Sequence, residues 1–107
     1  MENVLNELYN IIAKRKAEFN SGAEVEKSHT IRCFQEGLDY ILKKCGEECA
    51  ETIISAKNGD KQEIISETAD LFYHLMVMLA YKDIPLSDLF AELNKRAQKQ
   101  GNIKERR

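Results

Sequence analysis

The sequence contains few of the residues that interrupt or cross-link a chain. It has one proline and five glycines in 107 residues, and its three cysteines form no Cys-x-x-Cys pair. An odd cysteine count without such a pair argues against a disulfide framework. Because no linker rich in proline or glycine divides the chain, we expect a single domain over residues 1–107.

Long apolar runs and an excess of basic charge are also missing. No apolar segment reaches the ~20 residues of a membrane-spanning helix, and the opening MENVLNELYN lacks the features of a signal peptide. Sixteen basic and 18 acidic residues give a net charge of -2, so a general attraction to nucleic acid is not expected. We therefore expect a cytoplasmic protein that binds neither membrane nor nucleic acid.

Apolar residues recur at helical spacing through most of the chain, and no segment alternates as a strand does. The pattern predicts a helix over residues 2–19, then a polar loop, NSGAEVEKSH. A short helix capped by Thr30 follows, and Gly37 then gives a kink or a break. Two long helices, from Leu38 and over residues 61–83, precede a last helix over residues 86–100 and a charged tail. These elements predict an all-α antiparallel bundle of four to five helices.

The segment NGD at residues 58–60 is the clearest turn signal. Asn58 and Gly59 suit a left-handed helix C-terminus, and Asp60 suits an N-cap. Two long helices joined by so short a turn lie antiparallel. We expect their apolar stripes to form the core, including Cys45, Cys49 and the positions Leu38, Ile41, Leu42, Thr52, Ile53, Ala56, Ile64, Thr68, Leu71, Phe72, Leu75, Met78 and Leu79.

Acidic residues line one flank of each predicted stripe. Residues are placed at roughly 100° per position around each helix axis. On the helix from Leu38 this flank carries Lys44, Glu48, Glu51 and Ser55, and on the helix over residues 61–83 it carries Glu63, Glu67, Asp70 and His74. The pairs Glu48/Glu51 and Glu67/Asp70 then converge across the hairpin. Four carboxylates repel one another unless a cation lies between them, and oxygen ligands favour Mg²⁺, with Mn²⁺ as a substitute. The alternatives are a solvated acidic face or a di-iron site, but Leu71 stands where Glu-x-x-His would need an acid.

Several neighbouring side chains have roles that the sequence leaves open. His74 either hydrogen-bonds a metal-binding carboxylate, binds metal directly or has no chemical part. Glu47 completes the metal site, serves as a base toward a water or pairs with a cation across an interface. Lys44 and Lys57 are the expected phosphate-binding residues, ahead of Arg32, Lys95 and Arg96. Ile54, opposite the stripe, and the small size of the chain predict a homodimer or homotetramer.

The four acids on a helical hairpin resemble the all-α nucleoside triphosphate pyrophosphohydrolases, which include the MazG and dimeric dUTPase types. The stretches SHTIRCFQEGLDYILKKCGEECAE, SAKNGD, ETADLFYHLMVML and IPLSDLFAEL, within residues 28–93, are similar more narrowly to the phosphoribosyl-ATP pyrophosphohydrolase family of histidine biosynthesis. His29 departs from a tyrosine common in that family, and Cys45 and Cys49 replace aliphatic or small residues.

The resemblance implies hydrolysis of phosphoribosyl-ATP to phosphoribosyl-AMP and pyrophosphate by attack of water between the α and β phosphates. It implies Mg²⁺ ligation by Glu48, Glu51, Glu67 and Asp70. The catalytic base would be Glu47 or Glu51. Two rivals remain: a pyrophosphohydrolase acting on free nucleotides, and a helical interaction domain whose acids form a docking face.

Overall fold

The computed structural model describes residues 2–22 and 28–103, which form five α-helices and no strand. This confirms the predicted all-α class. In chain order the helices are α1 (Glu2–Asn20), α2 (His29–Glu36), α3 (Leu38–Asn58), α4 (Lys61–Tyr81) and α5 (Leu86–Ile103). None of the described helices is long and apolar enough to cross a membrane. Much of the predicted polar loop and the last four residues of the charged tail lie outside the described residues.

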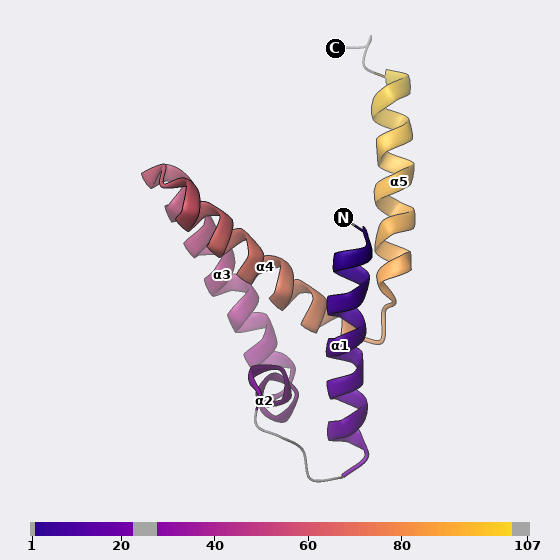
Figure 1. Cartoon of the computed structure of the whole chain (residues 1–107). Coiled ribbons are helices and arrows are strands. Elements are labelled where there is room, and N and C mark those ends of the chain that lie inside the picture. Colours follow the sequence, from indigo (N-terminus) through magenta and orange to yellow (C-terminus); the bar gives the residue numbers. More distant parts are fainter. Residues whose placement is uncertain (1, 23–27, 104–107) are drawn as a thin grey trace.

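Helices α3 and α4 form a long antiparallel hairpin (Figure 1). Helices α1 and α2 and the start of α5 gather at the open end of this hairpin, and its turn projects away from them (Figure 1). Residues 91–100 of α5 are exposed throughout. The structure is therefore centred on one hairpin whose turn half is covered by no other described helix.

The connection between α3 and α4 confirms the predicted turn. Gly59 is left-handed, with φ of 85°, and its N–H donates to the carbonyl of Ser55 at 3.0 Å. The Oδ1 atom of Asp60 accepts from the N–H of Gln62 at 3.0 Å and from that of Glu63 at 3.5 Å. Glycine adopts a positive φ without the steric penalty of a β-carbon, and the aspartate satisfies free N–H groups of the new helix.

The predicted cap of α2 is wrong by two positions. The helix begins at His29, and Ser28 precedes it in an extended conformation with its Oγ accepting from the N–H of Ile31 at 3.0 Å. Thr30 lies inside the helix, where its hydroxyl contacts that of Tyr73. The break predicted at Gly37 is present, with φ of 93°.

The core lies at the open end of the hairpin, where all the elements meet. Its buried members come from all five helices: Ile12, Cys33, Phe34, Ile41, Met76, Val77, Ala80 and Leu86. Several predicted core positions are exposed instead, namely Leu42, Cys49, Ile53, Ala56, Phe72 and Leu75, while Cys45 is half-buried. The predicted stripes run the length of both helices, but the other helices cover only one end, so the prediction is wrong for these positions.

Lys16 joins α1 to the end of α4. Its Nζ lies 2.8 Å from the carbonyl of Ala80, 3.2 Å from that of Tyr81 and 2.7 Å from Oδ1 of Asp83. The last carbonyls of a helix have no partner within the helix, and a cation there also favours the helix dipole. The side chain is 18% exposed, so this contact is largely shielded from water.

We expect Lys16→Met to lower the free energy of unfolding by about 2 kcal/mol, because charged hydrogen bonds to α4 are lost. Urea denaturation followed by circular dichroism measures the change. Lys14→Met, at an exposed position on the same helix, is the matched control. Equal stability of the two variants would contradict a role for Lys16 in holding α1 to α4.

Candidate functional site

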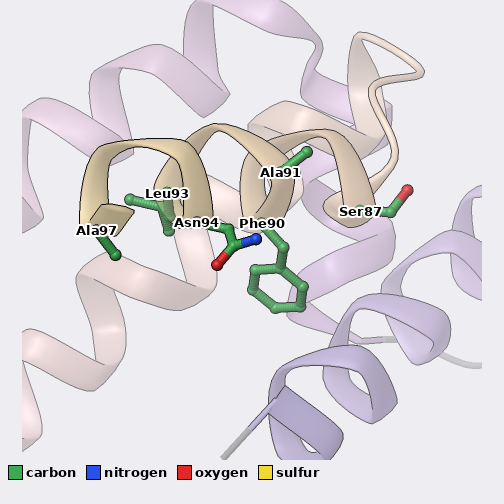
Figure 2. A pocket seen from close by; sticks show the side chains of 6 residues that line it. All are labelled: Ser87, Phe90, Ala91, Leu93, Asn94 and Ala97. Atoms are coloured by element: carbon green, nitrogen blue, oxygen red, sulfur yellow. The ribbon is translucent and has the colours of Figure 1, made fainter. Parts of the chain in front are cut away.

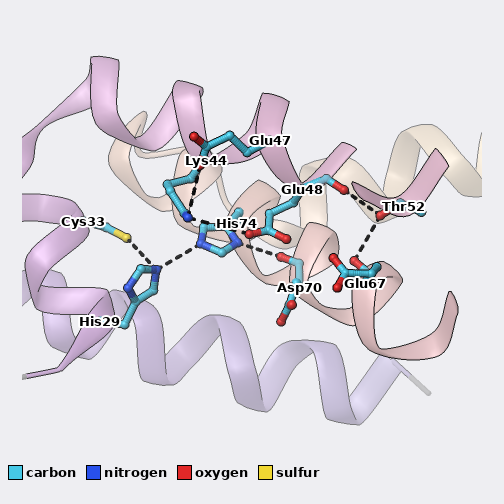
Figure 3. A network of polar contacts seen from close by, with 9 residues as sticks. All are labelled: His29, Cys33, Lys44, Glu47, Glu48, Thr52, Glu67, Asp70 and His74. Carbon is cyan, nitrogen blue, oxygen red and sulfur yellow. Dashed lines mark hydrogen bonds and ion pairs between the residues drawn. The ribbon is translucent and has the colours of Figure 1, made fainter. Parts of the chain in front are cut away.

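Three carboxylates meet between the two helices of the hairpin. Glu48 lies on α3, Glu67 and Asp70 lie on α4, and one oxygen of each falls within 4.8 Å of the others (Figure 3). The helices are antiparallel and the turn is short, so both acid pairs lie at a similar distance from it. The predicted convergence of these three acids is therefore confirmed.

Thr52, predicted as a core position, lies between the two helices beside the acids. The hydroxyl of Thr52 is 2.7 Å from the carbonyl of Glu48 and 3.1 Å from the carbonyl of Glu67 (Figure 3). The hydroxyl has a single hydrogen, which it can donate to only one of these two carbonyls at a time, and it lies close to the backbones of both helices. Ser55, one turn further along, is fully buried. Small side chains at these two positions allow α3 and α4 to approach closely beside the acids.

The carboxylate cluster is partly buried and incompletely paired: Glu48 is buried, Glu67 is half-buried and Asp70 is exposed. Glu48 is 7% exposed, and no hydrogen-bond partner is present for the buried Oε2 atoms of Glu48 and Glu67. Burial, followed by the charge of Glu51, raises the pKa of Glu48. The pKa of Glu67 is raised by the hydrogen bond that its protonated form can donate to Glu51 and then by desolvation. Buried acceptors without donors are costly, and a bound cation would satisfy both.

Glu51, the fourth predicted acid, is exposed at the edge of the cluster. It lies outside the set of three oxygens within 4.8 Å, yet it interacts electrostatically with Glu48 and Glu67. This carboxylate is therefore accessible to solvent and still within electrostatic reach of Glu48 and Glu67.

Repulsion in this cluster predicts how stability depends on pH in protein freed of divalent cations. The folded-state pKa values of Glu48 and Glu67 are raised, so the folded chain binds more protons than the unfolded chain between the ordinary and the raised values. Above that window both carboxylates are ionised and their destabilising effect on the fold is fully present. As pH falls through the window they take up protons, and the free energy of unfolding increases.

We accordingly expect Glu67→Gln to raise the melting temperature of the metal-free protein at neutral pH, and the difference to shrink as pH falls toward the ordinary glutamate pKa. Thermal denaturation in chelator over a pH series measures it. Glu63→Gln, an exposed acid on the same helix, is the control. A lower melting temperature for Glu67→Gln at neutral pH would show that repulsion is not the dominant effect there.

Glu47 and Lys44 form a pair next to the cluster. The Nζ of Lys44 lies 3.2 Å from Oε1 of Glu47 and 3.8 Å from Oε1 of Glu48 (Figure 3). Glu47 thus pairs with a cation of its own helix, whereas the expected pairing was with a cation across an interface. Lys44 is 25% exposed and is the predicted phosphate-binding residue nearest the acids.

The other predicted cations lie away from the three carboxylates or make different contacts. Lys57 is exposed in the last turn of α3. Arg32 stacks over the ring of Tyr40, with 5.4 Å between its Cζ and the ring centroid. Lys95 and Arg96 are exposed on α5, where Arg96 pairs with Glu92 at 3.0 Å.

His74 is held by the backbone of an acidic residue. Its Nδ1 lies 2.8 Å from the carbonyl oxygen of Asp70, and the ring is 5% exposed. The predicted hydrogen bond to a carboxylate is therefore replaced by a bond to the backbone of the same residue, because His74 follows Asp70 by one helical turn.

A hollow of about 580 Å³ on α5 is separate from these acids. Figure 2 shows its lining, which is Ser87, Phe90, Ala91, Leu93, Asn94 and Ala97. None of these six side chains titrates or carries a charge. The hollow is therefore unsuited to hydrolytic chemistry, and the carboxylate cluster is the stronger candidate.

Comparison with known proteins identifies the family of the chain. The family model for phosphoribosyl-ATP pyrophosphohydrolase matches residues 5–97. A Bacillus cereus protein named phosphoribosyl-ATP pyrophosphatase is 45% identical over 107 residues, covering the whole chain and 95% of that protein. A Clostridium botulinum protein of the same name is 47% identical over 105 residues, covering 98% of the chain and 91% of that protein. The chain belongs to the phosphoribosyl-ATP pyrophosphohydrolase family.

Proposed function

We propose that this protein hydrolyses phosphoribosyl-ATP to phosphoribosyl-AMP and pyrophosphate, the second step of histidine biosynthesis, in the cytoplasm. The observation that carries the proposal is the carboxylate cluster between α3 and α4, with two buried oxygens that no protein donor satisfies. It lies within the segment matched by the family model. The proposed substrate is taken from the name of the relatives, phosphoribosyl-ATP pyrophosphatase.

The residues present fit a Mg²⁺ site. Glu48, Glu67 and Asp70 supply oxygen donors within 4.8 Å of one another, and oxygen donors are what Mg²⁺ prefers. Glu51, in electrostatic contact with two of them, is the fourth proposed ligand. When bound, Mg²⁺ or Mn²⁺ neutralises polyphosphate charge and acidifies water.

The chain's own side chains then have separate tasks. The acid cluster cannot receive a triphosphate by itself because like charges repel. Lys44 lies beside the cluster and is partly exposed, so its Nζ is available to a phosphate oxygen. Glu51 is exposed, which leaves it open to solvent, and we assign it the acceptance of a proton from the attacking water. Lys57, near the turn, is a second proposed phosphate contact.

A pyrophosphate-release assay tests this function. The chain is incubated with phosphoribosyl-ATP, ATP, dCTP or dUTP, each with Mg²⁺ and with chelator. We expect Mg²⁺-dependent release from phosphoribosyl-ATP alone. Release from the free nucleotides at comparable rates would favour a general nucleotide pyrophosphohydrolase, and no release from any of them would favour an interaction domain.

We also propose that a second copy of this chain covers the exposed apolar side of the hairpin. Large apolar side chains are exposed on both of its helices: Ile53 is 64% exposed, Ile54 58%, Ile65 52% and Phe72 50%. Ile53, Ile54 and Ile65 lie near the turn ends of their helices, in the half of the hairpin that projects away from the other described helices (Figure 1). Two such hairpins facing each other would bury these residues and complete a four-helix arrangement.

We expect the purified protein to sediment as a homodimer or homotetramer and Phe72→Glu to shift it to monomer, because a charge at a buried apolar contact is costly. Gln62→Glu adds the same charge at an exposed polar position of the same helix and is expected to leave the assembly unchanged. Sedimentation velocity measures both. A monomeric unsubstituted protein would contradict this proposal without affecting the hydrolytic one.

A further inference from the structure

Three side chains outside the carboxylate cluster meet between α2 and α4. His29 and Cys33 stand four residues apart on one face of α2, and His74 faces them from α4 (Figure 3). The Nε2 atoms of His29 and His74 are 3.0 Å apart, and Sγ of Cys33 lies 3.6 Å from Nε2 of His29. All three donor atoms fall within 4.8 Å of one another.

The backbone contact of His74 indicates which of its ring nitrogens carries the hydrogen in the neutral ring. Nδ1 lies 2.8 Å from the carbonyl oxygen of Asp70, and a carbonyl only accepts hydrogen bonds, so Nδ1 carries the hydrogen. In the neutral ring the lone pair is then on Nε2, which faces His29 and Cys33. Histidines that bind metals are oriented in this way, with the other ring nitrogen donating to a backbone carbonyl or carboxylate.

The separations match those around a small tetrahedral ion. With Zn–N near 2.0–2.1 Å and Zn–S near 2.3 Å, tetrahedral geometry places two nitrogens roughly 3.3 Å apart and a nitrogen and a sulfur roughly 3.6 Å apart. The observed 3.0 Å and 3.6 Å are close to both values. The third separation, between Sγ of Cys33 and the ligand nitrogen of His74, is within 4.8 Å, so the three donors are close enough to share one ion after adjustment of their side chains.

We propose that His29, Cys33 and His74 bind one zinc ion, with solvent in the fourth position. Two nitrogens and a sulfur are the donors that zinc prefers, whereas Mg²⁺ selects oxygen. The site is thus chemically distinct from the carboxylate cluster, although His74 connects the two through the backbone of Asp70. Its occupation would tie α2 to α4.

The surroundings are compatible with this ion. Desolvation, followed by the neighbouring His74, Lys44 and Arg32, lowers the pKa of His29, so its ring is neutral as a ligand must be. Burial raises the pKa of Cys33. Its thiol is therefore protonated without metal and releases one proton when zinc binds. The nearby charge of Lys44 is compensated by Glu47 and Glu48.

Cobalt substitution in the full chain tests the proposal. Chelator-treated, reduced protein is titrated with Co²⁺ in excess Mg²⁺, which competes for the oxygen ligands. We expect sulfur-to-cobalt charge-transfer absorption and tetrahedral visible bands that saturate at one ion per chain and are lost when Zn²⁺ is added. Cys33→Ser should abolish the charge-transfer absorption. His29→Gln, at an exposed position, should weaken Co²⁺ binding at least about 100-fold.

Cys49→Ser is the matched cysteine control, because this thiol is exposed and lies outside the cluster. Glu67→Gln controls for the carboxylate site, and both variants should keep the absorption. Circular dichroism confirms folding of every variant, and Zn²⁺ should raise the melting temperature of the unsubstituted protein but not of His29→Gln. Absence of the charge-transfer absorption, its persistence in Cys33→Ser, or its loss in Cys49→Ser would overturn the proposal.

Discussion

Glu48→Gln is expected to lower kcat/KM for phosphoribosyl-ATP by roughly 10³-fold while leaving the helical circular dichroism signal unchanged. Glu48 supplies the most buried carboxylate of the cluster, and one of its oxygens has no protein donor. The amide keeps the shape of the side chain but removes its negative charge. Binding of the proposed Mg²⁺ is therefore weakened, whereas the cost of burying the charge and its repulsion with Glu51, which together raise the pKa of Glu48, are relieved.

Asp70→Asn, from the facing helix, should behave in the same way, because its carboxylate belongs to the same group of three. Glu63→Gln is the control and should retain activity, since Glu63 is an exposed acid outside this group. Pyrophosphate release over a range of Mg²⁺ concentrations measures each variant. Full activity of Glu48→Gln would show that the carboxylate cluster takes no part in the reaction. If the helical circular dichroism signal were lost as well, the loss of activity would be explained by unfolding of the variant.

Glu51→Gln is expected to lower kcat about 10²- to 10⁴-fold, the usual contribution of a general base, with little change in KM. Glu51 is exposed and interacts electrostatically with the buried Glu48 and the half-buried Glu67, so it is placed to accept a proton from water. Glu47→Gln should lower kcat less than about tenfold, because Glu47 forms a partly exposed pair with Lys44.

The comparison of these two variants decides which glutamate is the base. Steady-state kinetics at saturating Mg²⁺ separate kcat from KM, and the Mg²⁺ dependence separates proton transfer from metal binding. If excess Mg²⁺ restored Glu51→Gln, this residue would be a ligand only. A larger loss of kcat in Glu47→Gln than in Glu51→Gln would reverse the assignment.

Local chemistry explains why most of the hairpin could be predicted. Gly59 and Asp60 determine the turn through their own backbone and side-chain preferences, and both adopt the expected conformations. Once the turn is known, the helical repeat determines which acids face one another. Glu48, Glu67 and Asp70 could thus be brought together from spacing alone.

The incorrect predictions concern packing between distant segments. Helical periodicity identifies an apolar stripe but not which part of it another helix covers, so Phe72 and Cys49 were wrongly placed in the core. The meeting of His29 with His74 likewise depends on how α2 lies against α4, and no local pattern determines that. Thr52 carried a detectable signal, because it follows Glu48 by one turn and directly follows Glu51.

The short turn at Gly59 and Asp60 also controls the angular phase of α4 relative to α3. Adding one residue within α4 between Asp60 and Glu67 would rotate everything after it by about 100° about the helix axis. The carboxylates of Glu67 and Asp70 would then point away from Glu48, although both helices could still form. The number of residues between the two acid pairs is therefore as much a part of the site as the acids themselves.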